Sequence, residues 1–179
     1  SGSPLLISTN ASASGTTADL GATTGGIFVR QTSGTLDTAR YLVSTPANQT
    51  VSLSSAGNMT LSSLGGFSGA STDDLILSAD GAITINAGVG GTFRSVDITT
   101  AGASGITLGS GAASSWNASN GLSLTASSGS VSIAANLLNT STSANASISI
   151  DAAGNLSAAG LSTQGAALSL RAGTVTAGS

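Results

Sequence analysis

The side chains of this chain that can do acid–base or metal chemistry are few and of two kinds. Seven aspartates and four arginines carry all the side-chain charge of the 179 residues, and His, Cys, Lys and Glu are absent. A hydrolytic triad needs a His or another base beside its nucleophile, and a thiolate metal site needs Cys. Any catalysis would therefore have to rest on Asp and Arg.

Three of the aspartates are spaced so that they can meet. Asp74 and Asp97 lie 23 residues apart, and Asp73 adjoins Asp74. If the chain repeats at this interval, the three carboxylates form a patch that could bind Ca²⁺ or contact a sugar. Solvated turn residues are the plainer interpretation. Ion pairing with Arg94, near the same level of the repeat, is another.

A repeat of about 23 residues is present throughout the chain. The repeat is recognised by triplets in which two apolar residues flank one other residue. Three separate series of such triplets recur along the sequence with nearly the same spacing. The first starts at Leu5, Ile27, Val51, Leu75, Val96, Leu122, Ile148 and Leu168. The second starts at Leu36, Met59, Ile83, Ile106, Val131, Leu156 and Val175. A third and looser series contains Leu20, Leu42, Phe67, Phe93, Trp116, Leu138 and Leu161.

The triplets predict short strands rather than helices. Alternation with period 2 places the two apolar residues on one face and the middle residue on the other. The intervening segments are rich in Gly, Asn and Ser, which allow sharp turns. A triplet is too short to be stable alone, but stacked parallel coils give each one hydrogen-bonding neighbours. A hairpin meander fits poorly, since it has longer strands and no three-mark period.

We therefore predict an all-β fold, a right-handed parallel β-helix over residues 1–179 as one segment. Each coil has about 23 residues and three short strands, and seven to eight coils make a rod roughly 35 Å long. The opening SGSP suggests that residues 1–3 are a tag remnant, and the end in mid-pattern suggests an excised piece of a longer protein. Such a piece exposes strand edges, so we expect it to associate end to end.

The amino-acid composition argues against disorder and against several classes of partner. The 40% hydrophobic content and low charge argue against disorder. Four Arg without Lys give no basic footprint for nucleic acid. No apolar run approaches the ~18 residues of a membrane span.

The repeat resembles a known style. The stretches AGNMTLSSL, ADGAITINAG, SNGLSLTASSGSVSIAAN and DAAGNLSAAGLSTQGAALSLRAGTVTAGS resemble the repetitive shaft of filamentous-haemagglutinin-like exoproteins of Gram-negative bacteria, which are secreted by the two-partner route. The resemblance covers about residues 51–177. The secretion domain expected at the amino terminus of such a protein is not visible, so the resemblance implies an interior segment.

This resemblance implies a non-catalytic function without a cofactor or metal. The chain would be a structural and adhesive segment of a large secreted adhesin at the cell surface. An outer-membrane transporter would be its partner during secretion, and a glycan or protein of a host surface or matrix would be a contact along its flank. The alternative is a carbohydrate-active β-helix protein, a polysaccharide-binding protein or a lyase or hydrolase, which needs a clustered Asp and Arg face.

Several outward residues are candidate contacts. If Ile27 and Val29 point inward, Phe28 points outward beside Arg30, and Tyr41 could join them. Phe67, Phe93 and Trp116 are expected to fill the core, with a sugar-stacking platform as the alternative.

Outward Ser and Thr columns leave an ice-binding solenoid as a third hypothesis, although Phe28, Ile76 and Asp97 interrupt one of them. Seven Asn-x-Ser/Thr sequons, at Asn10, Asn48, Asn58, Asn117, Asn139, Asn145 and Asn155, leave glycosylation open.

Overall fold

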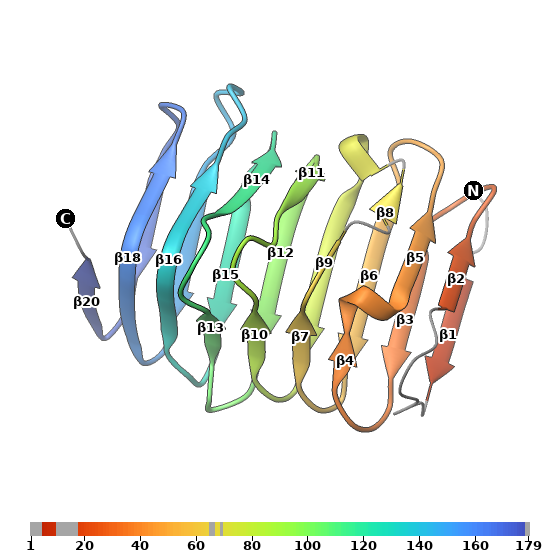
Figure 1. Cartoon of the computed structure of the whole chain (residues 1–179), viewed down its shortest axis with the longest axis horizontal. Coiled ribbons are helices and arrows are strands. Elements are labelled where there is room, and N and C mark those ends of the chain that lie inside the picture. The colour runs from red at the N-terminus through yellow and green to blue at the C-terminus, as the bar shows by residue number, and fades with distance from the viewer. Residues whose placement is uncertain (1–4, 10–17, 65–66, 69, 178–179) are drawn as a thin grey trace.

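The computed structural model describes residues 5–9, 18–64, 67–68 and 70–177, so the predicted tag remnant at residues 1–3 lies outside the described part. The strands are arranged as a stack of coils that runs the length of the molecule (Figure 1). All strand pairings of the described residues are parallel. The predicted all-β solenoid of stacked parallel coils is confirmed.

The first sheet contains one strand from each of eight successive coils. In spatial order these are β1 (Leu5–Thr9), β3 (Ile27–Gln31), β6 (Thr50–Ser55), β9 (Asp74–Ala79), β12 (Ser95–Thr100), β15 (Leu122–Ala126), β17 (Ile148–Ala152) and β19 (Leu168–Arg171). The first series of triplets aligns in register throughout, from Leu5 opposite Ile27 to Ile148 opposite Leu168. The number of residues between successive triplets varies without disturbing the register, because the extra residues lie in the turns.

The second sheet has nine strands and covers two further faces of the rod. Its members are β4 (Leu36–Asp37), β7 (Met59–Leu61), β10 (Ile83–Ile85), β11 (Gly91–Phe93), β13 (Ile106–Leu108), β14 (Ser114–Ala118), β16 (Val131–Asn139), β18 (Asn155–Thr163) and β20 (Thr174–Ala177). The long strands β16 and β18 join the two faces: the first half of β16 pairs with β13 and its second half with β14. The second series of triplets is also in register as predicted.

A third, three-stranded sheet completes the early coils. It consists of β2 (Ala18–Gly21), β5 (Tyr41–Ser44) and β8 (Phe67–Ser68). Two single-turn 3₁₀ helices, η1 (Thr38–Arg40) and η2 (Ala70–Thr72), lie in the connections beside these strands. The Asp37 side chain begins η1 by accepting a hydrogen bond from the Ala39 amide at 3.0 Å.

The winding is right-handed. In Figure 1 the chain runs downward along the first sheet on the far side and returns upward on the near side. It advances meanwhile from the N-terminal end at the right to the C-terminal end at the left. This is the hand that parallel crossovers prefer.

The core consists of the aliphatic columns that the triplets predict. Each inward member of the first two series from Val51 to Ile150 is at most 2% exposed. Burial of one such side chain contributes roughly 1.5–3 kcal/mol, so the columns offset the entropy of ordering very short strands. Among the first-series residues whose side chains the structure describes, Leu168 differs, because it is exposed.

The turn between the first and second sheets requires glycine for a steric reason. A Cβ built on Gly57 would lie 2.3 Å from the Gly34 carbonyl oxygen, and one on Gly81 would lie 2.9 Å from that of Gly57. The Gly81 amide donates to the Gly57 carbonyl at 2.8 Å. Successive coils therefore stack backbone on backbone at this corner, with no room for a side chain between them.

The third predicted series is only partly correct. Val43, rather than Leu42, lies opposite Leu20, and Leu42 is 42% exposed. Leu161 lies opposite Leu137 rather than Leu138. In both places adjacent apolar residues made the inward position ambiguous.

The aromatic residues of that series fill space inside the rod. Phe93 and Trp116 are at most 2% exposed, with ring centroids 6.4 Å apart and planes inclined by 39°. They are offset by two residues in register, since Trp116 lies opposite Gly91. Phe67 belongs to the third sheet and packs partly buried against the core. The prediction of a core role is therefore confirmed, although the three rings do not share one register line.

Candidate functional site

The candidate site lies where the third face of the rod turns into the first sheet. At this corner the chain enters β6, β9 and β12, and the backbone continues the parallel ladder. The Asp74 amide donates to the Gln49 carbonyl at 2.9 Å, and the Arg94 amide donates to the Asp73 carbonyl at 2.8 Å. Each coil therefore places its corner residues directly beside those of the next coil.

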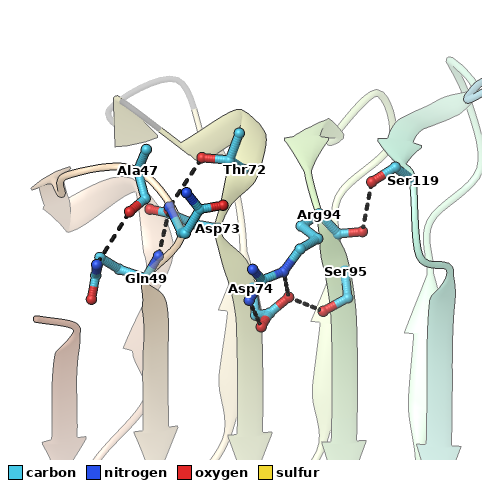
Figure 2. A network of polar contacts seen from close by, with 9 residues as sticks. Ala47, Gln49, Thr72, Asp73, Asp74, Arg94, Ser95 and Ser119 are labelled. Carbon is cyan, nitrogen blue, oxygen red and sulfur yellow. Dashed lines mark hydrogen bonds and ion pairs between the residues drawn. The ribbon is translucent and has the colours of Figure 1, made fainter.

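Asp74, Arg94 and Ser95 form the centre of a polar network, which we call the Asp74 network (Figure 2). The Arg94 guanidinium binds the Asp74 carboxylate through two hydrogen bonds, one of them from Nε to Oδ1 at 2.9 Å. The Ser95 hydroxyl donates to Oδ1 at 2.6 Å. Such a two-pronged ion pair is stronger than a single contact. The hydrogen bond from Arg94 holds the pKa of Asp74 below its usual value, so the carboxylate remains charged.

Asp73 does not join Asp74 in a common patch. Consecutive residues of a strand point to opposite faces, and the Asp73 side chain points inward and is fully buried. Its carboxylate accepts a hydrogen bond from the Thr45 hydroxyl and another, at 2.9 Å, from the backbone amide of Gln49. The interpretation of Asp73 as a surface contact is therefore wrong. This aspartate ties β9 to the connection that precedes β6.

Asp97 lies on the same outer face as Asp74 but two residues further along. In register, Asp74 is opposite Ser95, while Asp97 is opposite Ile76 on one side and Ser123 on the other. Partial burial raises the pKa of Asp97, and the neighbouring negative charge of Asp74 adds to the rise. The two carboxylates thus differ: Asp74 is held charged, whereas Asp97 takes up a proton more readily.

The three residues predicted around the exposed aromatic do not form one cluster. Phe28 is half-buried and lies in the outer column that continues through Ser52 and Ile76. Arg30 is exposed and pairs with Asp80 at 3.6 Å between Nη2 and Oδ2. Tyr41 is only 7% exposed, so its predicted surface contact is wrong. Its neighbour Leu42 points outward instead.

Other features of the described surface are shallow. One open hollow of about 440 Å³ lies near the C-terminal end, where Arg171 and Asp151 pair at 3.6 Å. A smaller one of about 180 Å³ lies between residues 62–64 and 87–90. Neither adjoins the Asp74 network. Within the described residues, no group of three or more His, Cys, Asp or Glu side chains is arranged to hold a metal ion.

A buried polar residue was missed at the sequence level. Asn139 is 1% exposed at the inward end of β16. Its side chain accepts from the Ala118 amide at 3.1 Å and donates to the carbonyls of Ala118 and Ala146 at 3.0 and 2.9 Å. The alternation of β16 gave the signal, because residues 131, 133, 135 and 137 of that strand all point inward. Its burial also excludes Asn139 from the accessible sequons, while Asn10 lies outside the described residues.

Comparison with known proteins adds no identification. No family model matches the chain, and neither does any curated protein or solved structure. In the part of the chain that the structure describes, no helix has the length and apolar character needed to cross a membrane.

Proposed function

We propose that this chain is a non-catalytic shaft segment of a large secreted bacterial adhesin of the filamentous-haemagglutinin-like type. The observation that carries the proposal is the rod itself, in which eight first-sheet strands stack in register. A rod of this kind separates two ends by a fixed distance, because each coil adds about 4.8 Å. Its function would be to hold a binding region away from the cell.

The outer surface supports a structural role. One column on the second sheet presents Thr60, Thr84, Thr107, Ser132 and Ser157 in succession. Thr and Ser suit exposed strands and need no ligand to explain them. The strong ion pair at Asp74 is satisfied within the molecule, which fits a structural contact better than proton transfer.

The proposal includes a location and partners. The protein would be secreted and displayed at the surface of a Gram-negative bacterium after passing an outer-membrane transporter. A chain without Cys suits passage in an unfolded state, since no disulfide can form early. Contact with a host or matrix glycan or protein would use the outer face of the first sheet, where half-buried Phe28 and exposed Ile76 share a column.

The coding sequence around this segment tests the proposal most directly. We expect further repeats of about 23 residues beside the segment, a secretion domain upstream and a transporter gene nearby. A coding sequence that joins the segment to a catalytic domain, with neither a secretion domain nor a transporter gene, would contradict the shaft function.

A carbohydrate-active protein is the second candidate. The observation that favours it is the flat face on which the Asp74 network, Asp97 and the exposed Ile76 lie on neighbouring strands. Small-molecule sites combine apolar surface with a few placed polar or charged groups. Sugar release from a panel of polysaccharides separates the two candidates. Turnover that is lost in both Asp74→Asn and Asp97→Asn would overturn the non-catalytic proposal.

A further inference from the structure

The coils of the rod are not joined equally on all three faces. On the third face the N-terminal part is the sheet of β2, β5 and β8, and the C-terminal part consists of β11, β14 and the second halves of β16 and β18. In the described part of the chain β8 pairs with β5 and β11 with β14, but β8 and β11 do not pair with each other. We call this interruption the seam. At the same level the first sheet continues from β6 to β9 and the second sheet from β7 to β10.

The helix η2 lies at the seam, where a strand pairing would otherwise continue the ladder. It follows β8 in the chain and lies beside β11 (Figure 1). A helix that covers a strand edge shields it from other strands, but it does not supply the row of backbone hydrogen bonds that joins two coils. The two coils are therefore held together less firmly on this face than on the other two.

A hollow lies at the same level, where the second face turns into the third. It has a volume of about 180 Å³ and lies between residues 62–64 of one coil and 87–90 of the next. Leu64 and Val89 line it and belong to the hydrophobic core. At the glycine corner the same two coils stack backbone on backbone, so their contact is looser here than there.

The two sides of the hollow are each bonded to the coil that lies away from the seam. On the N-terminal side, the Thr38 hydroxyl donates to the Ser63 carbonyl at 2.8 Å. On the C-terminal side, the Gly88 amide donates to the Ala112 carbonyl at 3.0 Å. The third face therefore consists of two separately bonded blocks that meet at the seam.

The coils on the two sides of the seam are tied firmly at the corner where the third face enters the first sheet (Figure 2). The Asp74 amide donates to the Gln49 carbonyl at 2.9 Å, and the buried Asp73 carboxylate accepts from the Gln49 backbone amide at 2.9 Å. The ion pair of Arg94 with Asp74 extends this connection to the next coil. The first sheet is therefore a continuous strap beside a face that is interrupted.

We propose that the seam is a hinge at which the rod bends. The first sheet stays intact, and the third face opens or closes between the coil that ends in β8 and the coil that begins with β9. A few residues between two firmly bonded blocks are sufficient for such a motion. The use of the hinge in a shaft, to let the far end tilt, rests on the proposed function. The bending itself does not, and it is measured on the purified chain rather than inferred from neighbouring genes.

Distances between spin labels on two faces test the hinge. Cysteines replacing Ser44 and Ser162, both exposed, lie five coils apart on the third face, with the seam between them. Cysteines replacing Phe28 and Ser149 lie on the first-sheet strands of the same two coils. A straight and rigid rod gives about 24 Å and equal widths for both pairs, since each coil adds about 4.8 Å. We expect the third-face distribution to be about twice as broad as the first-sheet distribution, because bending at the seam changes mainly the former. Equal widths, in samples diluted with unlabelled protein, overturn the proposal.

A pair of matched valine substitutions tests whether the bending occurs at the seam. Val89→Ala enlarges the hollow and should broaden the third-face distribution further while leaving the first-sheet distribution unchanged. Val131→Ala is the control, because Val131 is equally buried but lies in β16, away from the seam. It should leave both distributions as in the parent. If the two variants give the same third-face width, the flexibility does not lie at the seam and the hinge is refuted.

Discussion

At the scale of single residues, Asp74 and Asp97 show how one face can hold two carboxylates of opposite tendency. Arg94 lowers the pKa of Asp74, while partial burial and Asp74 raise that of Asp97. A lowered pKa means that the charged form stabilises the fold. A raised pKa means that the charged form costs stability, although solvent screening keeps this effect small for the exposed Asp97.

The contribution of Asp74 should depend on pH in a defined window. It is complete above the unfolded pKa of 3.8 and is lost as pH falls through the lower folded value. Asp74→Asn should therefore have a lower melting temperature than the wild type at neutral pH, and the gap should narrow below 3.8. In an Arg94→Met background the same substitution should show little pH dependence. An unchanged gap at acid pH would contradict the assignment.

The buried carboxylate of Asp73 should matter more for stability than exposed ones. Asp73→Ala leaves the Thr45 hydroxyl and the Gln49 amide without their acceptor. Each unsatisfied buried group costs about 1–3 kcal/mol. We therefore expect the free energy of unfolding, measured in urea, to fall by about 1–3 kcal/mol. Asp80→Ala, at an exposed ion pair, should change it by no more than about 0.5 kcal/mol. Equal effects would show that Asp73 is not the anchor described.

At the scale of elements, the sequence predicted strands and register where the apolar pattern was unambiguous. Triplets such as Ile83–Ile85 have one polar residue between two apolar ones, so only one face can turn inward. The third face was harder because Tyr41, Leu42 and Val43 are all apolar, and alternation alone does not choose among them. A register irregularity in β16 between Ile133 and Asn136 also shifts the later residues of β16 by one position relative to β18.

The candidate site could be predicted only in part for a related reason. Spacing brought Asp74 near Arg94 and Asp97, since these two residues follow it by 20 and 23 positions, about one coil. Spacing says nothing about direction, so the opposite orientations of Asp73 and Asp74 were missed. Extending the alternation of Leu75 and Leu77 back by two residues would have placed Asp73 inside.

The glycine corner gives a prediction at this scale. Gly57→Ala forces a Cβ against the Gly34 carbonyl, which is backbone and cannot move aside cheaply. We expect a loss of about 1–3 kcal/mol in the free energy of unfolding, as for other overpacked sites. Gly21→Ala is the control, because no atom lies within 4 Å of its added Cβ. If the two variants are equally stable, the close stacking of coils at this corner is incorrect.

At the scale of the whole molecule, each coil depends mainly on its two neighbours. The first-sheet pairings join residues 20 to 26 positions apart, for example Ile148 with Leu168 and Leu122 with Ile148. Stability in such an array is a sum over coils and their interfaces. This is why a triplet can be a strand here.

The stacking of equivalent positions is the central claim, and distances between spin labels test it directly. Ser52, Ser149 and Ser169 belong to one outward column, with Ser149 four coils and Ser169 five coils from Ser52. Labels at cysteines replacing Ser52 and Ser149 should be about 19 Å apart, and at Ser52 and Ser169 about 24 Å, since each coil adds about 4.8 Å. Samples diluted with unlabelled protein exclude distances between molecules. The account predicts an increase of one coil rise between the two pairs, and distances that do not increase with coil number would contradict it.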